Sequence, residues 1–329
     1  MDTLEKGAVR SQGYRWLRAP ELTVILAIVL VMLGFTVAAP ATFLSLRNVG
    51  SFLTVAAQLG AVAVGAAVLM IAGEFDLSAG SNFVFSGVVI ASLAQAHWPL
   101  ALALLAGLVV STLIGLINGL ITVWAKIPSF ITTLGAWLAW YGLSLALSGG
   151  NFVYVPTDSA LLGVLGGPLG HQFYASSAWW LVLGVVAIVL LRRSRLGNWI
   201  FAVGGRAEAA RAVGVPVIKV KLFCFAFMGL MCGISAIFLL AQQGSMSSLY
   251  GQNTALDAIA ASVIGGCSLF GGVGSVLGAM LGALMMSMLD SGLVLAGAPT
   301  FWYQTFVGVI IVLAVIVNTA ISRRILQAK

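Results

Sequence analysis

Apolar runs about as long as a lipid bilayer is thick follow one another along most of this chain. Hydrophobic residues make up 61% of the sequence and charged residues 8%, whereas an average soluble domain is about 25% charged. A membrane-spanning helix needs roughly 20 apolar residues, and the runs are continuous rather than alternating, as spanning helices require. The sequence therefore predicts an all-α, polytopic membrane protein.

Ten spans are expected, with both termini in the cytoplasm. Their approximate ranges are 22–39, 49–72, 81–96, 99–124, 129–148, 178–191, 218–242, 255–270, 275–297 and 301–321. In this topology every Lys and Arg except Arg47 lies in the cytoplasm, as expected because basic residues resist translocation. This distribution explains the net charge of +7 by membrane topology, so the charge does not indicate nucleic acid as a partner.

The same reading divides the chain into three parts. Residues 1–20 form a cytoplasmic tail, residues 21–321 a transmembrane domain, and residues 322–329 a second cytoplasmic tail. The first apolar run, 22–39, exceeds the roughly 7–15 residues of a signal-peptide core. This length favours an uncleaved first span over a cleaved signal peptide.

The largest interior island of charge covers residues 192–221. Its basic residues are Arg192, Arg193, Arg195, Arg206, Arg211, Lys219 and Lys221. Within it, alanines favour a helix of about two turns over RAEAARAV, and Gly214 ends it. Glu208 and Arg211 are spaced to pair on its surface. A helix this short needs a surface to pack on, so we expect a docking element for a cytoplasmic partner; the alternative is an ordinary solvated basic loop.

Catalytic and metal chemistry have little support in the sequence. The long external loop, 149–177, holds Asp158 and His171 but no accompanying nucleophile or second base, so we interpret His171 as solvated. The three cysteines have neither CxxC spacing nor a neighbouring histidine, which argues against disulfides and metal ligation. No GxxxxGK[ST] phosphate loop occurs. We expect no cofactor, and if ATP drives this protein, its hydrolysis belongs to a separate partner chain.

Two glycine-interrupted segments break the apolar pattern at membrane depth. They are IAGEFDLSAGSNF over 71–83 and VIGGCSLFGGVGSVLG over 263–278. Irregular backbone is tolerated there only when it is buried in protein or lines a wet cavity, so both are candidate pathway elements; the alternative is a pair of cytoplasmic turns. The glycine spacings 115/119 and 278/282 predict close helix packing.

Acidic and polar residues at membrane depth complete the set of pathway candidates. An ionised Asp at the centre of a spanning helix costs about 3 kcal/mol on insertion scales, so Asp290 should face other helices or water. Its role is then either to bind solute or an ion, or to link helices by hydrogen bonds. The candidates for the translocation pathway are Glu74, Asp76, Ser78, Asn118, Asp257 and Asp290.

Three motifs in order resemble one transporter family. They are GEFDLSAGS (73–81), FAVGGRAEAARAVGV (201–215) and LDAIAASVIGGCSLFGGVGSVLGA (256–279). With them the chain resembles the ribose-type sugar ABC-transporter permeases from about residue 45 to 320; that family also contains xylose, arabinose, galactose and autoinducer-2 permeases. The resemblance implies a multi-pass protein of the bacterial inner membrane. It also implies three kinds of partner: cytoplasmic ATP-binding-cassette ATPase subunits, a second permease copy or paralogue, and a periplasmic sugar-binding protein.

The resemblance also gives the central basic loop a role. It implies that this loop rests in a groove of the ATPase and transmits its closure to the membrane domain. The residues assigned to ATPase coupling are Gly204, Gly205, Arg206, Glu208, Ala209, Ala210, Arg211 and Gly214. The function expected is import of a small hydroxylated solute, a monosaccharide or polyol. The alternatives are an ion-coupled secondary carrier using Asp290 with Glu74 and Asp76, and a membrane-embedded enzyme.

One position departs from the family pattern. Members usually read G-G-[IF]-D-L-S, with glycine where this chain has Glu74. A second acid so close to Asp76 should raise the pKa of one carboxyl or recruit a cation. Glu74 is therefore either the mark of a subfamily with a distinct substrate or a neutral surface change.

Overall fold

The computed structural model describes residues 20–156, 159–170, 173–299 and 301–327. Asp158 and His171 lie outside the described residues. The long helices are α2 (Pro20–Ala38), α3 (Leu46–Ile71), α4 (Ala79–Gln95), α5 (Leu100–Ala125), α6 (Ser129–Ser148), α8 (Ala175–Arg193), α9 (Arg195–Ala212), α10 (Val217–Gln243), α12 (Val276–Leu295) and α13 (Phe301–Gln327). Shorter elements are α7 (Ala160–Gly166), α11 (Thr254–Ile264) and the 3₁₀ helix η2 (Ser248–Gly251). Two antiparallel strand pairs join β1 (Val153–Tyr154) to β4 (Ser245–Met246) and β2 (Pro168–Gly170) to β3 (Phe173–Tyr174).

A helix occurs at each of the ten ranges predicted as spans, but the helices differ in length. Six of them, α3, α5, α6, α8, α10 and α12, are long and apolar enough to cross a membrane by length and composition. The prediction of a continuous span over 255–270 is wrong. Helix α11 has only 11 residues and ends where Gly265 and Gly266 follow; Gly266 adopts a φ of +88°, which favours glycine and ends a helix.

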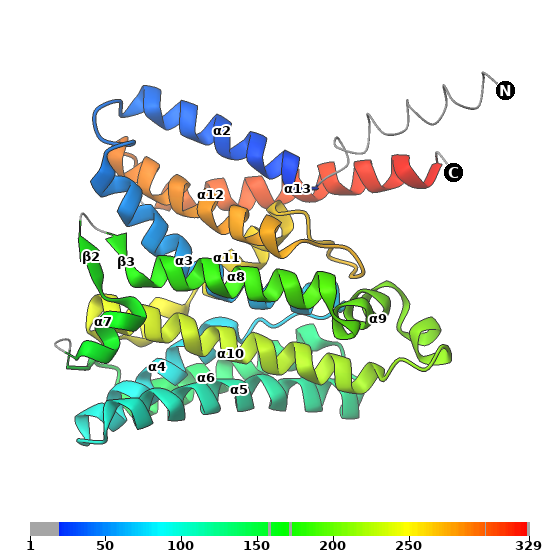
Figure 1. Cartoon of the computed structure of the whole chain (residues 1–329), viewed down its shortest axis with the longest axis horizontal. Coiled ribbons are helices and arrows are strands. Elements are labelled where there is room, and N and C mark those ends of the chain that lie inside the picture. Colours follow the sequence, from blue (N-terminus) through cyan, green and yellow to red (C-terminus); the bar gives the residue numbers. More distant parts are fainter. Residues whose placement is uncertain (1–19, 157–158, 171–172, 300, 328–329) are drawn as a thin grey trace.

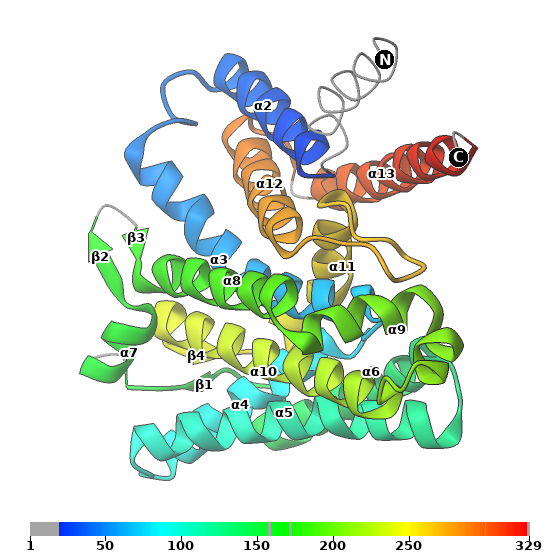
Figure 2. The same cartoon turned by 45° about the vertical axis from the view of Figure 1, so that its right-hand side comes forward.

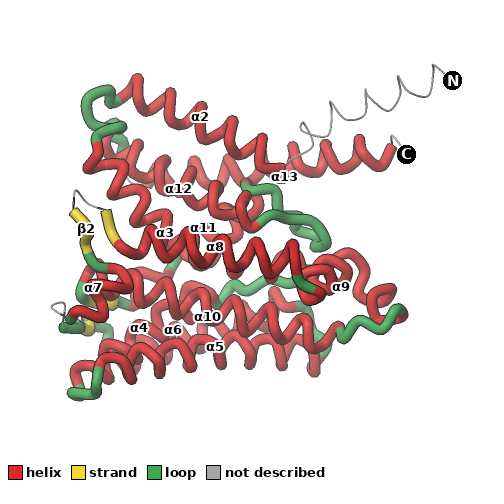
Figure 3. The backbone as a smooth tube through the Cα atoms, in the orientation of Figure 1, coloured by secondary structure: helices red, strands yellow, loops and turns green. Residues whose placement is uncertain are grey.

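Helices α5, α8 and α10 run roughly parallel to one another in both views (Figures 1 and 2). The start of α2, the described end of α13 and α9 lie at one end of the molecule. At the opposite end lie α7 and the β2–β3 pair of the predicted external loop, and Figure 3 shows how small the strand content is. The mostly helical fold agrees with the composition.

Burial separates central helices from peripheral ones. Most of the apolar stretch of α3, α10 and α12 is buried, whereas most of that in α5, α6 and α8 is not. Leu105 and Leu113 of α5 and Leu138 of α6 are among the exposed large apolar side chains. An apolar face of this kind suits a lipid environment rather than water.

Close packing at the predicted glycine spacings is confirmed. A Cβ built on Gly115 of α5 would lie 2.2 Å from the carbonyl oxygen of Phe225 on α10. On α12, a Cβ on Gly282 would lie 2.0 Å from the carbonyl oxygen of Ala261 on α11, and one on Gly278 would lie 1.9 Å from that of Gly265. Small residues at these positions let the helix backbones approach closely.

Candidate functional site

A non-helical segment over residues 72–78 joins α3 to α4 and carries most of the GEFDLSAGS motif. Its backbone N–H groups find partners on α6: that of Phe75 donates to Ser129 Oγ at 3.1 Å, and that of Leu77 to Thr133 Oγ1 at 3.0 Å. These hydroxyls replace the hydrogen bonds that helical backbone would supply, as irregular backbone in a membrane requires. The segment is therefore part of the helix bundle rather than a solvated turn.

Three of the predicted pathway residues form one buried polar cluster on this segment and α5. Asp76 Oδ1 accepts hydrogen bonds from the backbone N–H of Ser78 at 2.8 Å and from Ser78 Oγ at 2.6 Å. Asn118 Nδ2 donates to Ser78 Oγ at 2.7 Å and to Asp76 Oδ2 at 3.5 Å. Asn118 lies seven residues before the end of α5. This spacing corresponds to ~10 Å along the helix axis. The cluster holds the start of α4 against α5.

Glu74 has a different partner. Its carboxylate forms an ion pair with the ammonium group of Lys221 on α10, and only 7% of the residue is exposed. The positive charge beside this carboxylate is thus supplied by a lysine of the same chain. The interpretation of Glu74 as a neutral surface change is wrong, because the residue is buried.

The predicted docking helix is the second half of α9. Helix α9 is divided at Arg206, whose φ and ψ of −161° and 97° are extended, so that a short helical piece follows, ending at Ala212. Ala210 is buried, whereas Arg206, Glu208 and Arg211 are exposed. Glu208 and Arg211 do not form the predicted ion pair in the described part of the chain. Their charged groups are thus directed to the surroundings rather than to each other.

The first half of α9, which was predicted as a loop, packs on the two glycine-interrupted segments. A Cβ built on Gly204 would lie 1.7 Å from the carbonyl oxygen of Ile71, and one on Gly271 would lie 2.7 Å from the carbonyl oxygen of Gly204 and from Gly73 Cα. The backbone N–H of Gly272 donates to the carbonyl of Ile71 at 2.9 Å. All three sequence motifs therefore meet at one backbone contact, which only glycine permits.

Asp257 and Asp290 lie elsewhere, on the wall of a cavity of about 280 Å³. Its polar lining consists of Gln58, Ser235, Tyr250, Thr254, Asp257, Ser287, Asp290 and Tyr303, and its apolar lining includes Phe83 of α4 and Leu239 of α10. Neither carboxylate forms a hydrogen bond or ion pair with another residue in the part of the chain that the structure describes. Both are therefore available to a bound polar solute.

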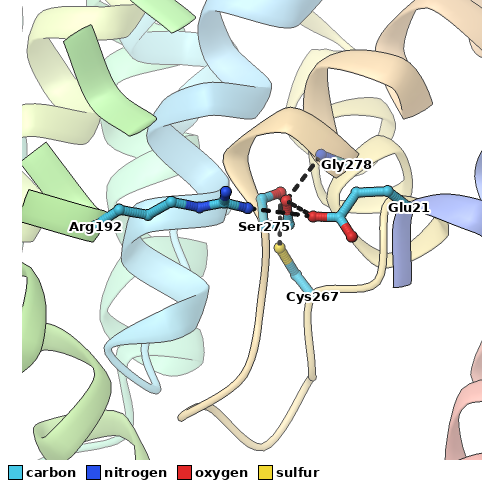
Figure 4. Close-up of polar contacts among 5 residues, drawn as sticks. All are labelled: Glu21, Arg192, Cys267, Ser275 and Gly278. Carbon is cyan, nitrogen blue, oxygen red and sulfur yellow. Dashed lines mark hydrogen bonds and ion pairs between the residues drawn. The ribbon is translucent and has the colours of Figure 1, made fainter. Parts of the chain in front are cut away.

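A further polar network lies at the end of the molecule where α9 is found (Figure 4). Ser275 caps α12 by accepting from the backbone N–H of Gly278 at 3.2 Å, and its hydroxyl donates to Glu21 Oε1 of α2 at 2.7 Å. Arg192 of α8 approaches the same carboxylate oxygen at 3.6 Å. The network joins the ends of three helices that are far apart in the sequence.

Comparison with known proteins shows the family of the chain. Residues 48–315 match the family described as the permease component of branched-chain amino acid transport systems. The chain is 36% identical to the xylose transport system permease protein XylH of Escherichia coli K12, over 95% of this chain and 96% of that protein. It belongs to the sugar ABC-transporter permease family, which includes autoinducer-2 permeases.

Two other relatives support this membership. The chain is 36% identical to the probable ABC transporter permease protein YphD of E. coli K12, over 94% of this chain and 92% of that protein. It is 30% identical to the autoinducer 2 import system permease protein LsrC of Yersinia enterocolitica, over 97% and 89%. The family resemblance carried by the three motifs is confirmed. As an ABC permease, the chain is a multi-pass inner-membrane transport subunit and not an enzyme, and ATP hydrolysis belongs to a separate subunit.

The structure of this permease groups the six predicted pathway residues in three places. Asp76, Ser78 and Asn118 form the buried cluster, Glu74 pairs with Lys221, and the two remaining acids share the cavity. Sequence reasoning missed the cavity residues Gln58 and Tyr303, and nothing in a single sequence marks a glutamine or a tyrosine within an apolar helix as cavity-lining. It also missed Glu21, although an acid in the first turn of an expected helix is a recognisable signal.

Proposed function

We propose that this ABC permease forms the membrane pathway of an ATP-driven importer for a small hydroxylated solute, a monosaccharide or polyol. The observation that carries the proposal is the second half of α9, which presents Arg206, Glu208 and Arg211 outward while the first half packs on segment 72–78. A surface element with unpaired charges suits docking on another protein. An ATPase that pushed it toward segment 72–78 would displace the segment as well.

The volume and the polar lining of the cavity support a monosaccharide or polyol as the solute. At about 280 Å³ it lies near the lower end of small-molecule pockets, which range roughly from 300 to 1,000 Å³. Its carboxylates accept hydrogen bonds from hydroxyl groups, and its amide and hydroxyls both donate and accept. Tyr250, Tyr303 and Phe83 add aromatic surface for the C–H faces of a sugar ring. The relative XylH bears the name of a xylose permease, which makes xylose the first solute to test.

The proposed topology has ten membrane helices, with α11 and the preceding residues 244–253 forming one crossing. The end that carries α9, the start of α2 and the described end of α13 faces the cytoplasm, because the basic residues of 192–221 belong there. The partners proposed are cytoplasmic ABC ATPase subunits, a second permease copy or paralogue, and a periplasmic sugar-binding protein. Together they complete the path from the periplasm to the cytoplasm.

Co-purification from native membranes tests the docking surface. The solubilised chain should bring down a protein identified by mass spectrometry as an ABC ATPase, and Arg211→Glu should abolish its recovery. Arg47→Glu is the matched control, since this exposed arginine lies at the start of α3, on the opposite side in the proposed topology. Equal recovery from all three chains would contradict the proposed docking surface.

Transport in proteoliposomes tests the energy source. With the co-purified ATPase and the binding protein present, uptake of labelled xylose or another monosaccharide or polyol should require ATP on the ATPase side. The permease reconstituted alone should take up nothing. Gradient-driven uptake by the permease alone would instead support the alternative of an ion-coupled carrier.

A further inference from the structure

The ion pair between Glu74 and Lys221 connects two parts of the permease with different roles. Lys221 is the fifth residue of α10, which begins at Val217 a few residues after α9 ends at Ala212. Glu74 lies in segment 72–78, two residues before Asp76. The pair therefore bridges the corner between α9 and α10 and the irregular segment that leads into α4.

Burial distinguishes this pair from the other ion pair of the described residues. The Glu74 and Lys221 side chains are 9% and 24% exposed, whereas Arg192 in its pair with Glu21 is 65% exposed. Exposed pairs are screened by water and add little. Removal of one member of this partly buried pair leaves the other charge with less compensation, so the pair favours keeping Glu74 and Lys221 together.

Segment 72–78 also leads to the cavity. Its backbone is held on α6 by Ser129 and Thr133, and Asp76 is held on α5 by Asn118. Directly after it, α4 begins at Ala79 and carries Phe83, which lines the solute cavity. A displacement of this segment would thus reach the cavity wall.

The contacts between the segment and the corner differ in kind. The close packing of Gly204 against Ile71 is steric, so it resists approach of the two backbones but not their separation. An ion pair resists separation because it is attractive. Among the described residues, the Glu74–Lys221 pair is the only hydrogen bond or ion pair between segment 72–78 and either α9 or α10. It is the contact that would make the segment follow when the corner withdraws.

We infer that Lys221 is a positioning residue for transport, which through Glu74 makes segment 72–78 follow the α9–α10 corner in both directions of the ATPase cycle. The inference rests on the importer function proposed above. Without the pair, closure of the ATPase would still push the segment through the glycine contact, but reopening would not draw it back. ATP hydrolysis would then continue while the solute cavity failed to reset.

The test is the amount of solute imported per ATP hydrolysed by the complete importer in proteoliposomes. Glu74→Gln and Lys221→Met should retain the ATPase partner and keep basal ATP hydrolysis within twofold, while import per ATP falls at least tenfold. Lys221→Arg, which keeps the charge, should restore at least half of the wild-type ratio. Lys219→Met is the matched control, because this exposed lysine on the same helix has no ion-pair partner in the described part of the chain, and it should behave as wild type.

Two double variants keep the inference falsifiable if a single variant fails to accumulate. The exchange Glu74→Lys with Lys221→Glu restores the attraction and should regain most of the coupling. The neutral pair Glu74→Gln with Lys221→Met leaves no unpaired charge and should remain uncoupled. A wild-type ratio in either Lys221→Met or the neutral pair would overturn the inference. Absence of ATP-dependent uptake in the wild-type importer would instead refute the proposed function.

Discussion

The backbone N–H of Gly272 donates to the carbonyl of Ile71 at 2.9 Å, and Gly204 of α9 packs against that same carbonyl oxygen. One peptide group at the end of α3 thus contacts both the loop that precedes α12 and the first half of α9, which precedes the proposed docking surface. The contact has no room for a side chain. It explains in physical terms why glycines occur in all three motifs.

Substitution of Gly204 should show how tight this contact is. Gly204→Ala introduces a Cβ that would lie 1.7 Å from the carbonyl oxygen of Ile71, and relief of such overpacking costs roughly 1–3 kcal/mol. Gly205→Ala is the matched control, since a Cβ there meets no atom within 4 Å. Thermal unfolding in detergent should show a lower midpoint for Gly204→Ala and an unchanged one for Gly205→Ala. Equal midpoints would mean that the backbone can separate without cost.

Charge reversal on the proposed docking surface should uncouple the ATPase without affecting the fold. Glu208 is exposed and has no ion-pair partner among the described residues, so Glu208→Lys should leave membrane insertion and unfolding temperature unchanged. We expect stimulation of ATP hydrolysis by the solute-loaded binding protein to fall at least tenfold. The introduced positive charge would face a partner surface that complements the negative charge of Glu208, and the two would repel each other. Undiminished stimulation would remove Glu208 from the interface.

The buried cluster around Asp76 should contribute to stability. Asn118→Ala removes the donor to Ser78 Oγ and Asp76 Oδ2, and loss of a buried hydrogen bond to a polar or charged group costs about 1–3 kcal/mol. Asn151→Ala, at an exposed position in the loop that follows α6, is the control. Chemical denaturation in detergent should separate the two variants. If Asn118→Ala unfolds like the control, the cluster is not a structural linker.

The sequence predicted the features that depend on neighbouring residues. Apolar runs located the helices, the alanines of RAEAARAV with Gly214 located the short helix that ends at Ala212, and small-residue spacing located the close contacts at Gly115 and Gly282. Each signal acts within a few turns of chain. The helical first half of α9 was missed because Gly204 and Gly205 lower helix propensity, and packing on Ile71 and Gly272 compensates for it.

Features that join distant parts of the chain could not be predicted from the sequence. Glu74 and Lys221 are 147 positions apart, and no local pattern selects this lysine from its neighbours in 192–221. The cavity likewise combines single residues from several helices. The early end of α11 was missed because an apolar run continues past the glycines, and hydropathy measures composition rather than backbone conformation.

The cavity acids provide the sharpest test of solute binding. Asp290→Asn keeps the size of the side chain and part of its hydrogen-bonding capacity, whereas Asp290→Leu keeps only the approximate volume and leaves solute hydroxyls without a partner. Each lost hydrogen bond to a charged group is worth about 1.5–3 kcal/mol, or roughly tenfold or more in affinity. We expect Asp290→Leu to reduce ATP-driven uptake at least tenfold and Asp290→Asn to reduce it less, both with normal ATPase recovery.

The neighbouring Ser291→Ala is the control, because this hydroxyl donates to Asn48 Oδ1 at 2.5 Å and does not line the cavity. Uptake measured over a range of solute concentrations should show a raised KM for the Asp290 variants and an unchanged KM for Ser291→Ala. A change in KM places the residue on the solute's path, because a helix linker would alter the amount of folded permease and not its affinity. If Asp290→Leu fails to accumulate while Asp290→Asn transports with a wild-type KM, Asp290 is a structural linker and the solute does not bind there.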